Sequence, residues 1–543
     1  MRSEWVGWPV VRGLLSKSIY QGLAGGMKLR IPNYQSGFCV KRGGWQLVRK
    51  FPEELIPEDF PLGEERLLEC ARRFGTPLYI YDAGVARRRL NALKEMLPEG
   101  TGISYSLKAN PAKELVALFA GLGCGVEVSS LGEFDVLSGL NLEDQMSLWV
   151  GPAKSDTELM AAVNGGCLVV AESAREVARI ENVANHCCFA ARVALRINPG
   201  IRSGALSMAG STQFGMEFTE ALYLLRHGKE SRVDICGIHG FLGTRLLDAN
   251  KLAENISIVL DIATKLQVES GRRFSIVDVG GGFGVPLYEG EGRLAGKELK
   301  GLLVEDFGRY LDANPWTKVV GVESGRFLCS EAGVLLVKVV SVKEVHGTRF
   351  PIVDGGQNII GGRDGYLGRK LTPMKLLSPS GRGEGRYTIC GPLCTPTDRL
   401  AVDVTMGNVT EGDIIAIYQA GAYCATASPG RFLGRGFARE IYHDEGSFED
   451  VFTGGGMGDE LVDEKLKNLI VEVARGSVDP EEVVEGKKLR EELGFDSVAL
   501  VDLIVALEAT FGIYVDPLEV DLTKVFDSTT TLREFLQERV RRG

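Results

Sequence analysis

The chain has 543 residues, 44% hydrophobic and 25% charged, a composition that excludes a disordered, collagenous or coiled-coil protein. Its formal charge of −10 gives no general attraction to nucleic acid or to anionic membranes, and no stretch approaches the roughly 20 apolar residues that a membrane span needs. The eleven cysteines are odd in number and lack paired C-x-x-C motifs, and the N-terminus lacks a signal-peptide pattern, so we expect a cytoplasmic protein without disulfides or a metal.

The hydrophobic runs divide the chain into modules. From residue 79 to residue 325, about eight β-type runs, the first of them LYIYD (78–82), alternate with helical ones. This alternation is typical of a parallel α/β barrel, and an open doubly wound sheet is the alternative. The predicted divisions are an N-terminal extension of unknown role (1–26), the first part of a β-domain (27–78), the α/β barrel (79–325), the rest of the β-domain (326–440), a linker (441–460) and a C-terminal module (461–543).

The regions after the barrel differ from it in texture. Residues 326–440 are β-rich with turn signals, which predicts an antiparallel domain. The linker is Gly-rich and acidic, as flexible segments often are. The module after it has 18 acidic and 11 basic residues, so most of the net negative charge of the chain lies in one small unit.

Two motifs follow predicted barrel strands, where barrels keep their active-site residues. YSLKAN (105–110) carries Lys108, which is suited to a Schiff base with an aldehyde cofactor, and a salt bridge at the barrel rim is the alternative. VDVGGGFGVP (277–286) carries Gly280, Gly281 and Gly282. These glycines let backbone amides approach a phosphate, unless they only make a tight turn.

Two further motifs add chemistry. ESGR (323–326) ends the last β-type run, where Arg326 suits a phosphate and Glu323 suits a protonated ring nitrogen; a surface ion pair is the alternative. In the β-domain, CGPLCTPTD (390–398) contains Cys394, which is a candidate general acid or else a buried structural thiol.

Taken together and in this order, the motifs resemble those of the fold-type III pyridoxal-phosphate (PLP) decarboxylases, the group that includes the diaminopimelate, ornithine and arginine decarboxylases. The matching strings are YSLKAN, CGVEVSSLGE (124–133), LRINP (195–199), GIHGFLGT (237–244), GGGFG (280–284), ESGR, CGPLC and GAY (421–423). The resemblance covers about residues 30–440. It implies a PLP-binding (β/α)8 barrel with a β-domain, in a homodimer with shared active sites.

The resemblance also implies roles for single residues. Lys108 would hold PLP as a Schiff base, Glu323 would keep the pyridine nitrogen protonated, and Cys394 would reach across the dimer interface to protonate Cα. The other cofactor-binding residues that it implies are Glu127, Arg196, Phe241, Thr244, Gly280, Gly281, Gly282, Gly325, Arg326 and Tyr423.

Two positions depart from the common pattern of this family. Phe241 stands where a histidine stacks on the PLP ring; it is able to stack but not to donate a hydrogen bond. Thr395 stands where an acidic residue recognises the distal amine of basic substrates, and a buried ammonium without a carboxylate partner is costly. Free lysine, ornithine, arginine and diaminopimelate are therefore disfavoured as substrates.

The C-terminal module has one decisive string. LGFDSVALVDLIVALEATFGI (493–513) places Ser497 at the start of an amphipathic helix, where it is an N-cap candidate. The string also resembles the phosphopantetheine attachment site of acyl carrier proteins, which are small acidic four-helix bundles. The resemblance implies that Ser497 carries 4′-phosphopantetheine, with a phosphopantetheinyl transferase and an aminoacyl ligase or other biosynthetic enzymes as partners.

A decarboxylase fused to a carrier predicts a substrate that the carrier presents. A thioester at the α-carboxyl group would leave no free carboxylate to depart as CO₂. The amino acid must therefore be attached to the carrier through another carboxyl group, as in a γ-glutamyl thioester. We therefore predict α-decarboxylation of a carrier-bound amino acid in natural-product biosynthesis. The alternatives are a decarboxylase of a free amino acid, a PLP racemase, and a non-catalytic barrel that serves as a scaffold for the carrier.

Overall fold

The computed structural model describes most of the chain from residue 37 onward. The described residues are 37–41, 44–58, 60–140, 142, 146–201, 206–228, 232–363, 367–377, 383–451, 466–471, 473–474, 478–479, 482–484, 486–511, 515 and 520–542. The predicted N-terminal extension (1–26) and residues 452–460 of the predicted linker therefore lie outside the described residues.

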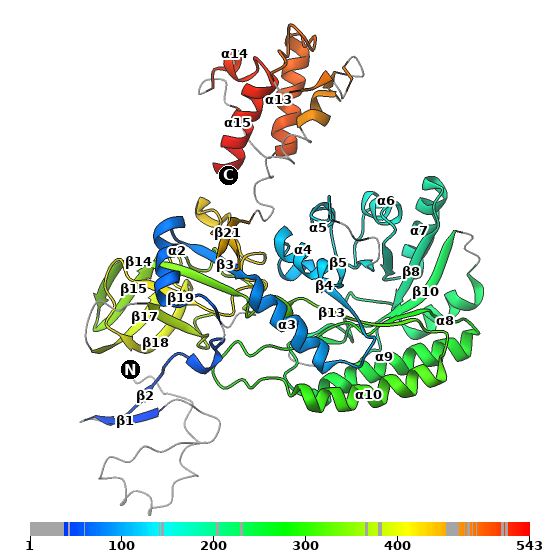
Figure 1. The fold of residues 1–543 in the computed structure, drawn as a ribbon, viewed down its shortest axis with the longest axis horizontal. Coiled ribbons are helices and arrows are strands. Elements are labelled where there is room, and N and C mark those ends of the chain that lie inside the picture. The colour runs from blue at the N-terminus through cyan, green and yellow to red at the C-terminus, as the bar shows by residue number, and fades with distance from the viewer. Residues whose placement is uncertain are drawn as a thin grey trace, which may run out of the picture.

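Within these ranges, eight parallel strands close into a barrel with helices around it (Figure 1). The strands are β4 (Gly102–Ser106), β5 (Gly125–Val128), β6 (Ser147–Trp149), β7 (Leu168–Ala171), β8 (Ala191–Arg196), β10 (Val233–His239), β12 (Ile276–Asp278) and β13 (Val319–Ser324). Their order is β10-β12-β13-β4-β5-β6-β7-β8, so the barrel is confirmed and the open doubly wound sheet is excluded.

The barrel strands appear as apolar runs because the helices bury them from outside and side chains fill the inside. The intervening helices are α4 (Lys113–Gly121), α5 (Leu131–Asp135), α6 (Asp156–Asn164), α7 (Ala174–Cys187), α8 (Phe218–His227), α9 (Ala249–Ser270) and α10 (Gly296–Ala313). Side-chain caps start several of them. Ser155 forms a capping box with Glu158 at α6, and Asp248 accepts the amide of Lys251 at α9.

A second sheet forms the other half of this body. Its strands are β3 (Leu78–Asp82), β14 (Gly333–Val345), β15 (Thr348–Val353), β16 (Met374–Leu377), β17 (Glu384–Cys390), β18 (Arg399–Gly407), β19 (Ile414–Ile417), β20 (Arg439–Asp444) and β21 (Ser447–Asp450). The sheet is mixed rather than antiparallel as predicted, because β20 pairs parallel to β3 and β15 pairs parallel to β17.

Two predicted boundaries are wrong: the residue where the barrel begins and the residue where the linker begins. LYIYD, expected as the first barrel strand, is β3 of the mixed sheet, and the barrel strand that the pattern missed is the three-residue β6. β3 has a core on each face, with Leu78 and Ile80 packed in one and Tyr79 and Tyr81 in the other, so its apolar run resembles that of a barrel strand. α2 (Glu64–Phe74) supplies Leu67 and Cys70 to the first of these cores.

The predicted linker begins too early. Residues 441–450 belong to the β20–β21 hairpin, in which Ile441 and Tyr442 are buried. The first part of the sequence that suggested flexibility, residues 443–446, leads into the turn of this hairpin, where Glu445 has φ 47° and Gly446 has φ 92°. Its Gly-rich second part, residues 453–459, lies outside the described residues. Positive φ at both central residues is what a two-residue hairpin turn requires, and glycine tolerates it best.

The C-terminal residues build a separate helical core. Helical residues 466–471 precede α13 (Ser497–Phe511), α14 (Leu522–Val525) and α15 (Thr529–Arg542). Their buried side chains form a cluster of their own: Leu466, Leu469, Ile470, Val478, Val483, Leu489, Leu493, Phe495, Leu500, Leu503, Leu507, Val515, Phe526, Leu532 and Leu536.

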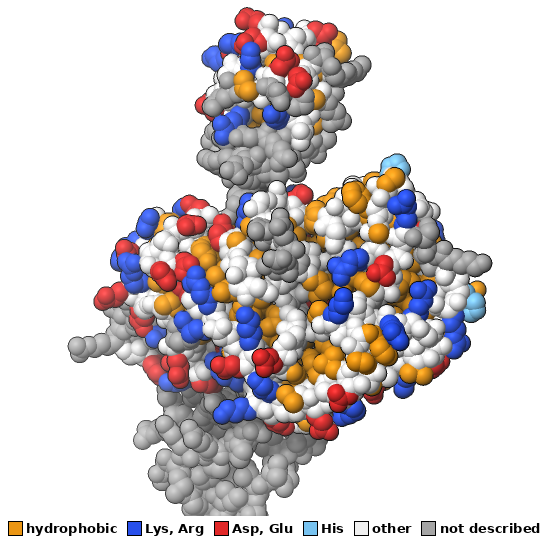
Figure 2. All heavy atoms as spheres, turned by 45° about the vertical axis from the view of Figure 1, so that its right-hand side comes forward, with side chains coloured by type: hydrophobic (Ala, Val, Ile, Leu, Met, Phe, Trp, Pro, Cys, Tyr) orange, Lys and Arg blue, Asp and Glu red, His pale blue; other side chains and the backbone are white. Residues whose placement is uncertain are grey.

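No helix in the described ranges has the length and apolar character to cross a membrane. On the face that Figure 2 shows, acidic and basic side chains are interspersed.

Candidate active site

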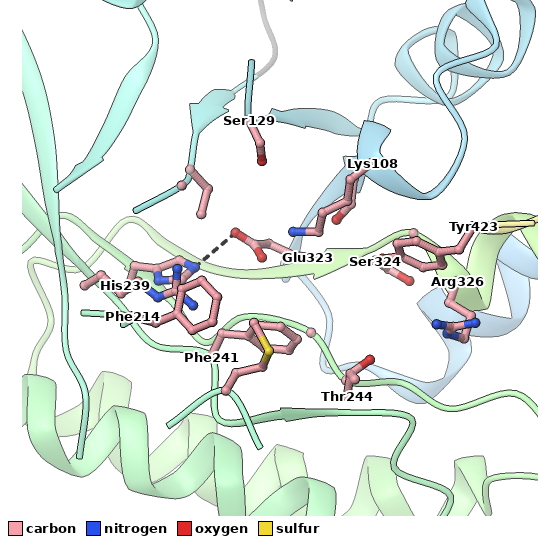
Figure 3. Close-up of a pocket in the computed structure, with 18 of the residues that line it drawn as sticks. Lys108, Ser129, Phe214, His239, Phe241, Thr244, Glu323, Ser324, Arg326 and Tyr423 are labelled. Atoms are coloured by element: carbon pink, nitrogen blue, oxygen red, sulfur yellow. Dashed lines mark hydrogen bonds and ion pairs between the residues drawn. The ribbon is translucent and has the colours of Figure 1, made fainter. Parts of the chain in front are cut away.

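A cavity of about 570 Å³ lies at the C-terminal ends of the barrel strands (Figure 3). It collects most of the residues that the sequence assigned to a cofactor. Those that line it are Lys108, Arg196, Phe241, Thr244, Gly281, Gly282, Glu323, Gly325, Arg326 and Tyr423. These residues come from segments spread over more than 300 positions, so the fold brings the separate motifs to one place.

Lys108 lies in the single turn η2 (Leu107–Ala109), directly after β4, and its Nζ forms an ion pair with Glu127 of β5. Glu127 is fully buried, whereas the Lys108 side chain is 36% exposed and lines the cavity. Burial alone would lower the pKa of Lys108, but the carboxylates of Glu127 and Glu323 outweigh it and raise the pKa above the ordinary value. The ion pair expected at a barrel rim therefore exists, and it belongs to the cavity.

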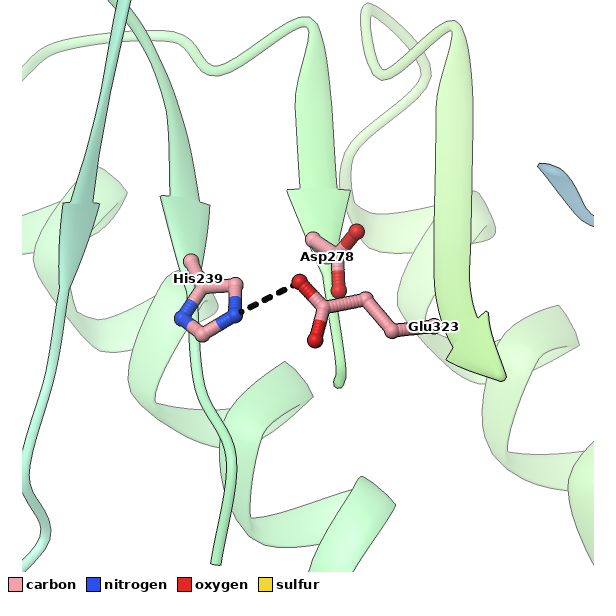
Figure 4. A group of neighbouring side chains, drawn as sticks. All are labelled: His239, Asp278 and Glu323. Atoms are coloured by element: carbon pink, nitrogen blue, oxygen red, sulfur yellow. Dashed lines mark hydrogen bonds and ion pairs between the residues drawn. The ribbon is translucent and has the colours of Figure 1, made fainter. Parts of the chain in front are cut away.

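Glu323, at the end of β13, is held by His239 of β10: its Oε1 is 3.1 Å from His239 Nε2 (Figure 4). Burial would raise the pKa of this carboxyl, but His239, Lys108 and Arg196 lower it to about 2. Glu323 is therefore a carboxylate at neutral pH. An ionised carboxylate is the group that keeps a ring nitrogen protonated.

Arg196 is fixed on two sides. Its Nη1 donates to Glu172 at 2.7 Å, and its guanidinium carbon lies 4.6 Å from the ring centroid of Phe214. Glu172 is itself held by the amide of Gly215 at 2.5 Å. Because these partners lock the arginine, its charge acts on Glu323 from a fixed place.

The glycines on the other side of the cavity have no room for side chains. Gly280 and Gly282 have φ values of +70° and +104°, and a Cβ on Gly281 would lie 2.3 Å from the carbonyl oxygen of Glu323. A Cβ on Gly325 would lie 2.6 Å from that of Ala109. A larger residue would be strained or would clash at these positions, and Gly281, Gly282 and Gly325 line the cavity without side chains.

Arg326 lies beside these glycines with a free donor. Its guanidinium carbon is 4.5 Å from the ring centroid of Tyr423, and its buried Nε has no hydrogen-bond partner among the described residues. Figure 3 shows Thr244 and Tyr423 on either side of it. A glycine cradle beside a guanidinium with an unpartnered Nε fits a phosphate ester. A lysine amine and a carboxylate in the same cavity fit an aldehyde and a ring nitrogen. The residues present therefore fit PLP.

Three predicted residues do not line this cavity. Glu127 lies behind Lys108 as its ion-pair partner, and the Gly280 amide donates to Asp278 at 2.8 Å. Cys394 is exposed, so it is not the buried structural thiol of the alternative reading. Buried Asp398 holds its loop, accepting the amides of Leu393 and Gln357 at 2.8 and 2.7 Å.

The sequence analysis missed Met208, Phe214 and Lys154, which also line the cavity. The Lys154 side chain is 2% exposed, and its Nζ donates to the carbonyls of Gly151 and Val170 and to Glu176. Its string GPAKS gave no signal of this, because a single lysine after a β-type run usually faces solvent.

In the C-terminal core, Ser497 is exposed at the first position of α13. The helix cap is Asp496, whose Oδ1 accepts the amides of Val498 and Ala499 at 2.9 and 2.8 Å. The N-cap reading of Ser497 is therefore wrong by one residue. Val498 and Val501 beside it are 68% and 58% exposed, which leaves an apolar face next to the serine.

Comparison with known proteins agrees with both sites. Residues 84–330 match the pyridoxal binding domain of the pyridoxal-dependent decarboxylases, and residues 464–538 match the phosphopantetheine attachment site. The L-glutamyl-[BtrI acyl-carrier protein] decarboxylase of Niallia circulans is 32% identical over 424 residues, which cover 75% of this chain and 97% of that protein. This chain belongs to the pyridoxal-dependent decarboxylases.

Other relatives of this decarboxylase are named diaminopimelate decarboxylases. The diaminopimelate decarboxylase of Aquifex aeolicus is 29% identical over 388 residues, covering 70% of this chain and 90% of that enzyme. The crystal structure of the Helicobacter pylori diaminopimelate decarboxylase complexed with L-lysine is similar with a TM-score of 0.62 and 26% identity, over 71% of this chain and 95% of that one. The PLP-dependent decarboxylase activity and the phosphopantetheine attachment region predicted from the motifs are thereby confirmed.

Proposed function

We propose that this decarboxylase removes the α-carboxyl group from an amino acid, such as glutamate, whose side-chain carboxyl is a thioester of the phosphopantetheine on Ser497. One observation carries the proposal: a PLP-type cavity and an exposed attachment serine occur in the same chain. The Niallia circulans relative acts, by its name, on a glutamyl group held by a carrier protein. Here the carrier is covalently joined to the enzyme, which raises the local concentration of the substrate.

The residues of the cavity have different roles in the proposed reaction. PLP, when bound, supplies an electron sink for the charge that the departing CO₂ leaves on Cα. Lys108 is the amine that holds the cofactor, and Glu323 holds the proton of the ring nitrogen. Gly281, Gly282, Thr244, Gly325, Arg326 and Tyr423 would hold the phosphate. Gly280 would support this cradle from behind, since its amide donates to Asp278. Phe241 would pack on the ring. Glu127 forms an ion pair with Lys108, and the charge of Arg196 lowers the pKa of Glu323.

The lining of the cavity supports a substrate without a distal charge. Met208, Phe214 and Phe241 give it an apolar wall. At the position after Cys394, Thr395 offers a hydroxyl that lies 2.9 Å from that of Thr397, and no carboxylate. A thioester end needs no ionic partner, whereas a distal ammonium would be left unpaired at this position.

We also propose a homodimer in which Cys394 completes the partner's site. Cys394 is exposed and does not line the cavity of its own chain. Beside its loop, Phe432, Leu433 and Phe437 are 48%, 53% and 51% exposed, and Arg435 ties their segment to the loop by donating to the Pro392 carbonyl at 3.3 Å. Exposed apolar groups next to a candidate acid support a subunit interface there.

The proposal extends to the cellular setting. A phosphopantetheinyl transferase would modify Ser497, and an aminoacyl ligase or another biosynthetic enzyme would load it. The product, a carrier-bound ω-amino acyl group, would serve natural-product assembly in the cytoplasm.

The test measures CO₂ release by the full phosphopantetheinylated chain. We expect release from a γ-glutamyl thioester on Ser497 and far less from free glutamate, and none from Ser497→Ala offered the same loading system. Equal release from free glutamate by Ser497→Ala would favour the free amino-acid alternative. Exchange of the Cα proton without CO₂ would favour a racemase, and neither reaction would favour the scaffold.

A further inference from the structure

Three ionisable side chains meet beside the cavity, one from each of three neighbouring strands, and two of them line it. They are His239 of β10, Asp278 of β12 and Glu323 of β13, with exposed fractions of 0%, 0% and 4% (Figure 4). Their nearest nitrogen and carboxylate oxygen atoms all lie within 4.8 Å of one another. The register pairs His239 directly with Asp278, so the backbone fixes this meeting.

The two carboxyl groups have unequal surroundings. Glu323 accepts from His239 and faces the positive charges of Lys108 and Arg196. Asp278 accepts one backbone amide, that of Gly280, on Oδ1, and its buried Oδ2 has no hydrogen-bond partner among the described residues.

Two carboxylates so close in a buried place do not both ionise readily, since each raises the cost of charging the other. The groups that face Asp278 are Glu323 from β13, His239 from β10 and Glu127 from β5. Burial and Glu323 raise the pKa of Asp278 to about 7, although His239 opposes them. The unequal surroundings therefore place the negative charge on Glu323 and the proton on Asp278.

We propose that Asp278 is a positioning residue that acts as a neutral carboxylic acid, so that the negative charge of this trio lies on Glu323, which faces the cavity. An ionised Asp278 would compete with Glu323 for the His239 N–H and would place a second buried negative charge beside it. The hydrogen bond that holds Glu323 in place to accept from a protonated ring nitrogen would then be weakened. The inference rests on the proposed role of Glu323 at the pyridine nitrogen.

The direct test is infrared spectroscopy of the full chain without PLP. We expect the wild-type minus Asp278→Asn difference spectrum to contain the C=O stretch of a protonated acid below the Asp278 pKa of about 7, and to lose it above. Asparagine has the shape of the neutral acid and keeps an acceptor for Gly280, so Asp278→Asn should bind PLP within about threefold of wild type, with the same visible absorbance.

Two variants calibrate that result. Glu323→Gln should weaken PLP binding by about tenfold or more, because it removes a charge-assisted hydrogen bond. Glu114→Gln is the matched control: Glu114 is another carboxyl whose pKa burial raises and whose Oε2 has no partner among the described residues, but it does not line the cavity. It should leave PLP affinity unchanged.

Two outcomes would overturn the proposal: no acid band in the Asp278 difference spectrum below pH 7, or a loss of PLP affinity in Asp278→Asn as large as that in Glu323→Gln. If Asp278→Asn does not fold, wild-type protein labelled with ¹³C-aspartate gives the same answer, because a protonated aspartate band must shift with the label. None of these measurements uses a carrier-bound substrate, so they stand apart from the proposed reaction.

Discussion

Lys108, two residues after the end of β4, forms an ion pair with Glu127 of the neighbouring strand β5, at the point where Ser106 and Glu127 are in register. The pair holds the lysine as an ammonium, whereas an amine attacks an aldehyde only when it is unprotonated. The carboxylates near Lys108 therefore set the pH at which it reacts.

Glu127→Gln should shift the reaction of Lys108 with PLP to lower pH. The substitution removes the first of the charges that raise the pKa of this lysine. The measurement is the rate at which the apoprotein acquires a borohydride-trapped pyridoxyl group, over a series of pH values. Glu95→Gln, at an exposed site on α3 (Ala83–Met96), is the control, and an unchanged pH midpoint in Glu127→Gln would refute the assignment.

Asp278 should make the apoprotein less stable as the pH rises. Its pKa is about 7 in the folded chain against 3.8 as the ordinary value, so between these values the unfolded chain gives up a proton that the folded chain keeps. As the pH rises through this window, the free energy of unfolding of the wild type should fall by about 1.4 kcal/mol per pH unit relative to that of Asp278→Asn.

Urea unfolding of both apoproteins at two pH values within that window measures the difference. The opposite shift of Glu323, to about 2, adds stability that is complete above its ordinary pKa of 4.5 and is lost as pH falls toward 2, so it does not interfere at higher pH. A difference that does not change with pH would contradict the assignment.

Substitutions at Asp496 and at Ser497 should have different effects, one on the stability of α13 and the other on the addition of phosphopantetheine. Asp496→Ala removes the acceptor of two amides of α13 and should destabilise the helix by about 1 kcal/mol, seen as faster hydrogen exchange of its first turn in the full chain. Ser497→Ala should leave that exchange unchanged and abolish addition of phosphopantetheine, seen by mass spectrometry. Faster exchange in Ser497→Ala would mean that the serine is itself the cap.

Gln267 should be the most sensitive polar position between α9 and α10. Its side-chain oxygen accepts hydrogen bonds from the backbone amide of Phe274 at 2.8 Å and from the indole N–H of Trp316 at 2.5 Å. Its side-chain nitrogen donates to Asn314 Oδ1 at 2.8 Å. Gln267→Leu leaves these buried groups unpaired and should lower the free energy of unfolding by about 2–4 kcal/mol. Lys265→Ala, at an exposed site on the same helix, should change it little. Equal effects in thermal unfolding would show that the network contributes nothing.

The sequence was sufficient for the barrel and for most of its cavity. Alternating runs identify a parallel α/β fold because each strand is buried on both faces, and Lys108, Gly281 and Glu323 follow such runs. Strand membership was harder: LYIYD is apolar because it has a core on each face, which is also true of a barrel strand. β6 has only three residues, too few to show a pattern.

The hydrophobic pattern of the sequence does not show which distant residues come into contact. The meeting of His239, Asp278 and Glu323 depends on strand register. The burial of Lys154 depends on the Val170 carbonyl and the Glu176 carboxylate, which lie further along the chain. The cap of α13 lay one residue before the expected one, because an aspartate and a serine in succession both suit an N-cap.

The central claim is that the cofactor on Lys108 acts on a group attached to Ser497. Its most direct test is the intact mass of the full phosphopantetheinylated chain, loaded with a γ-glutamyl thioester and supplied with PLP. The mass should fall by that of one CO₂ while the acyl group stays on the carrier, and it should not fall in Lys108→Ala. A loaded chain that holds PLP on Lys108 and keeps its full mass would contradict the account.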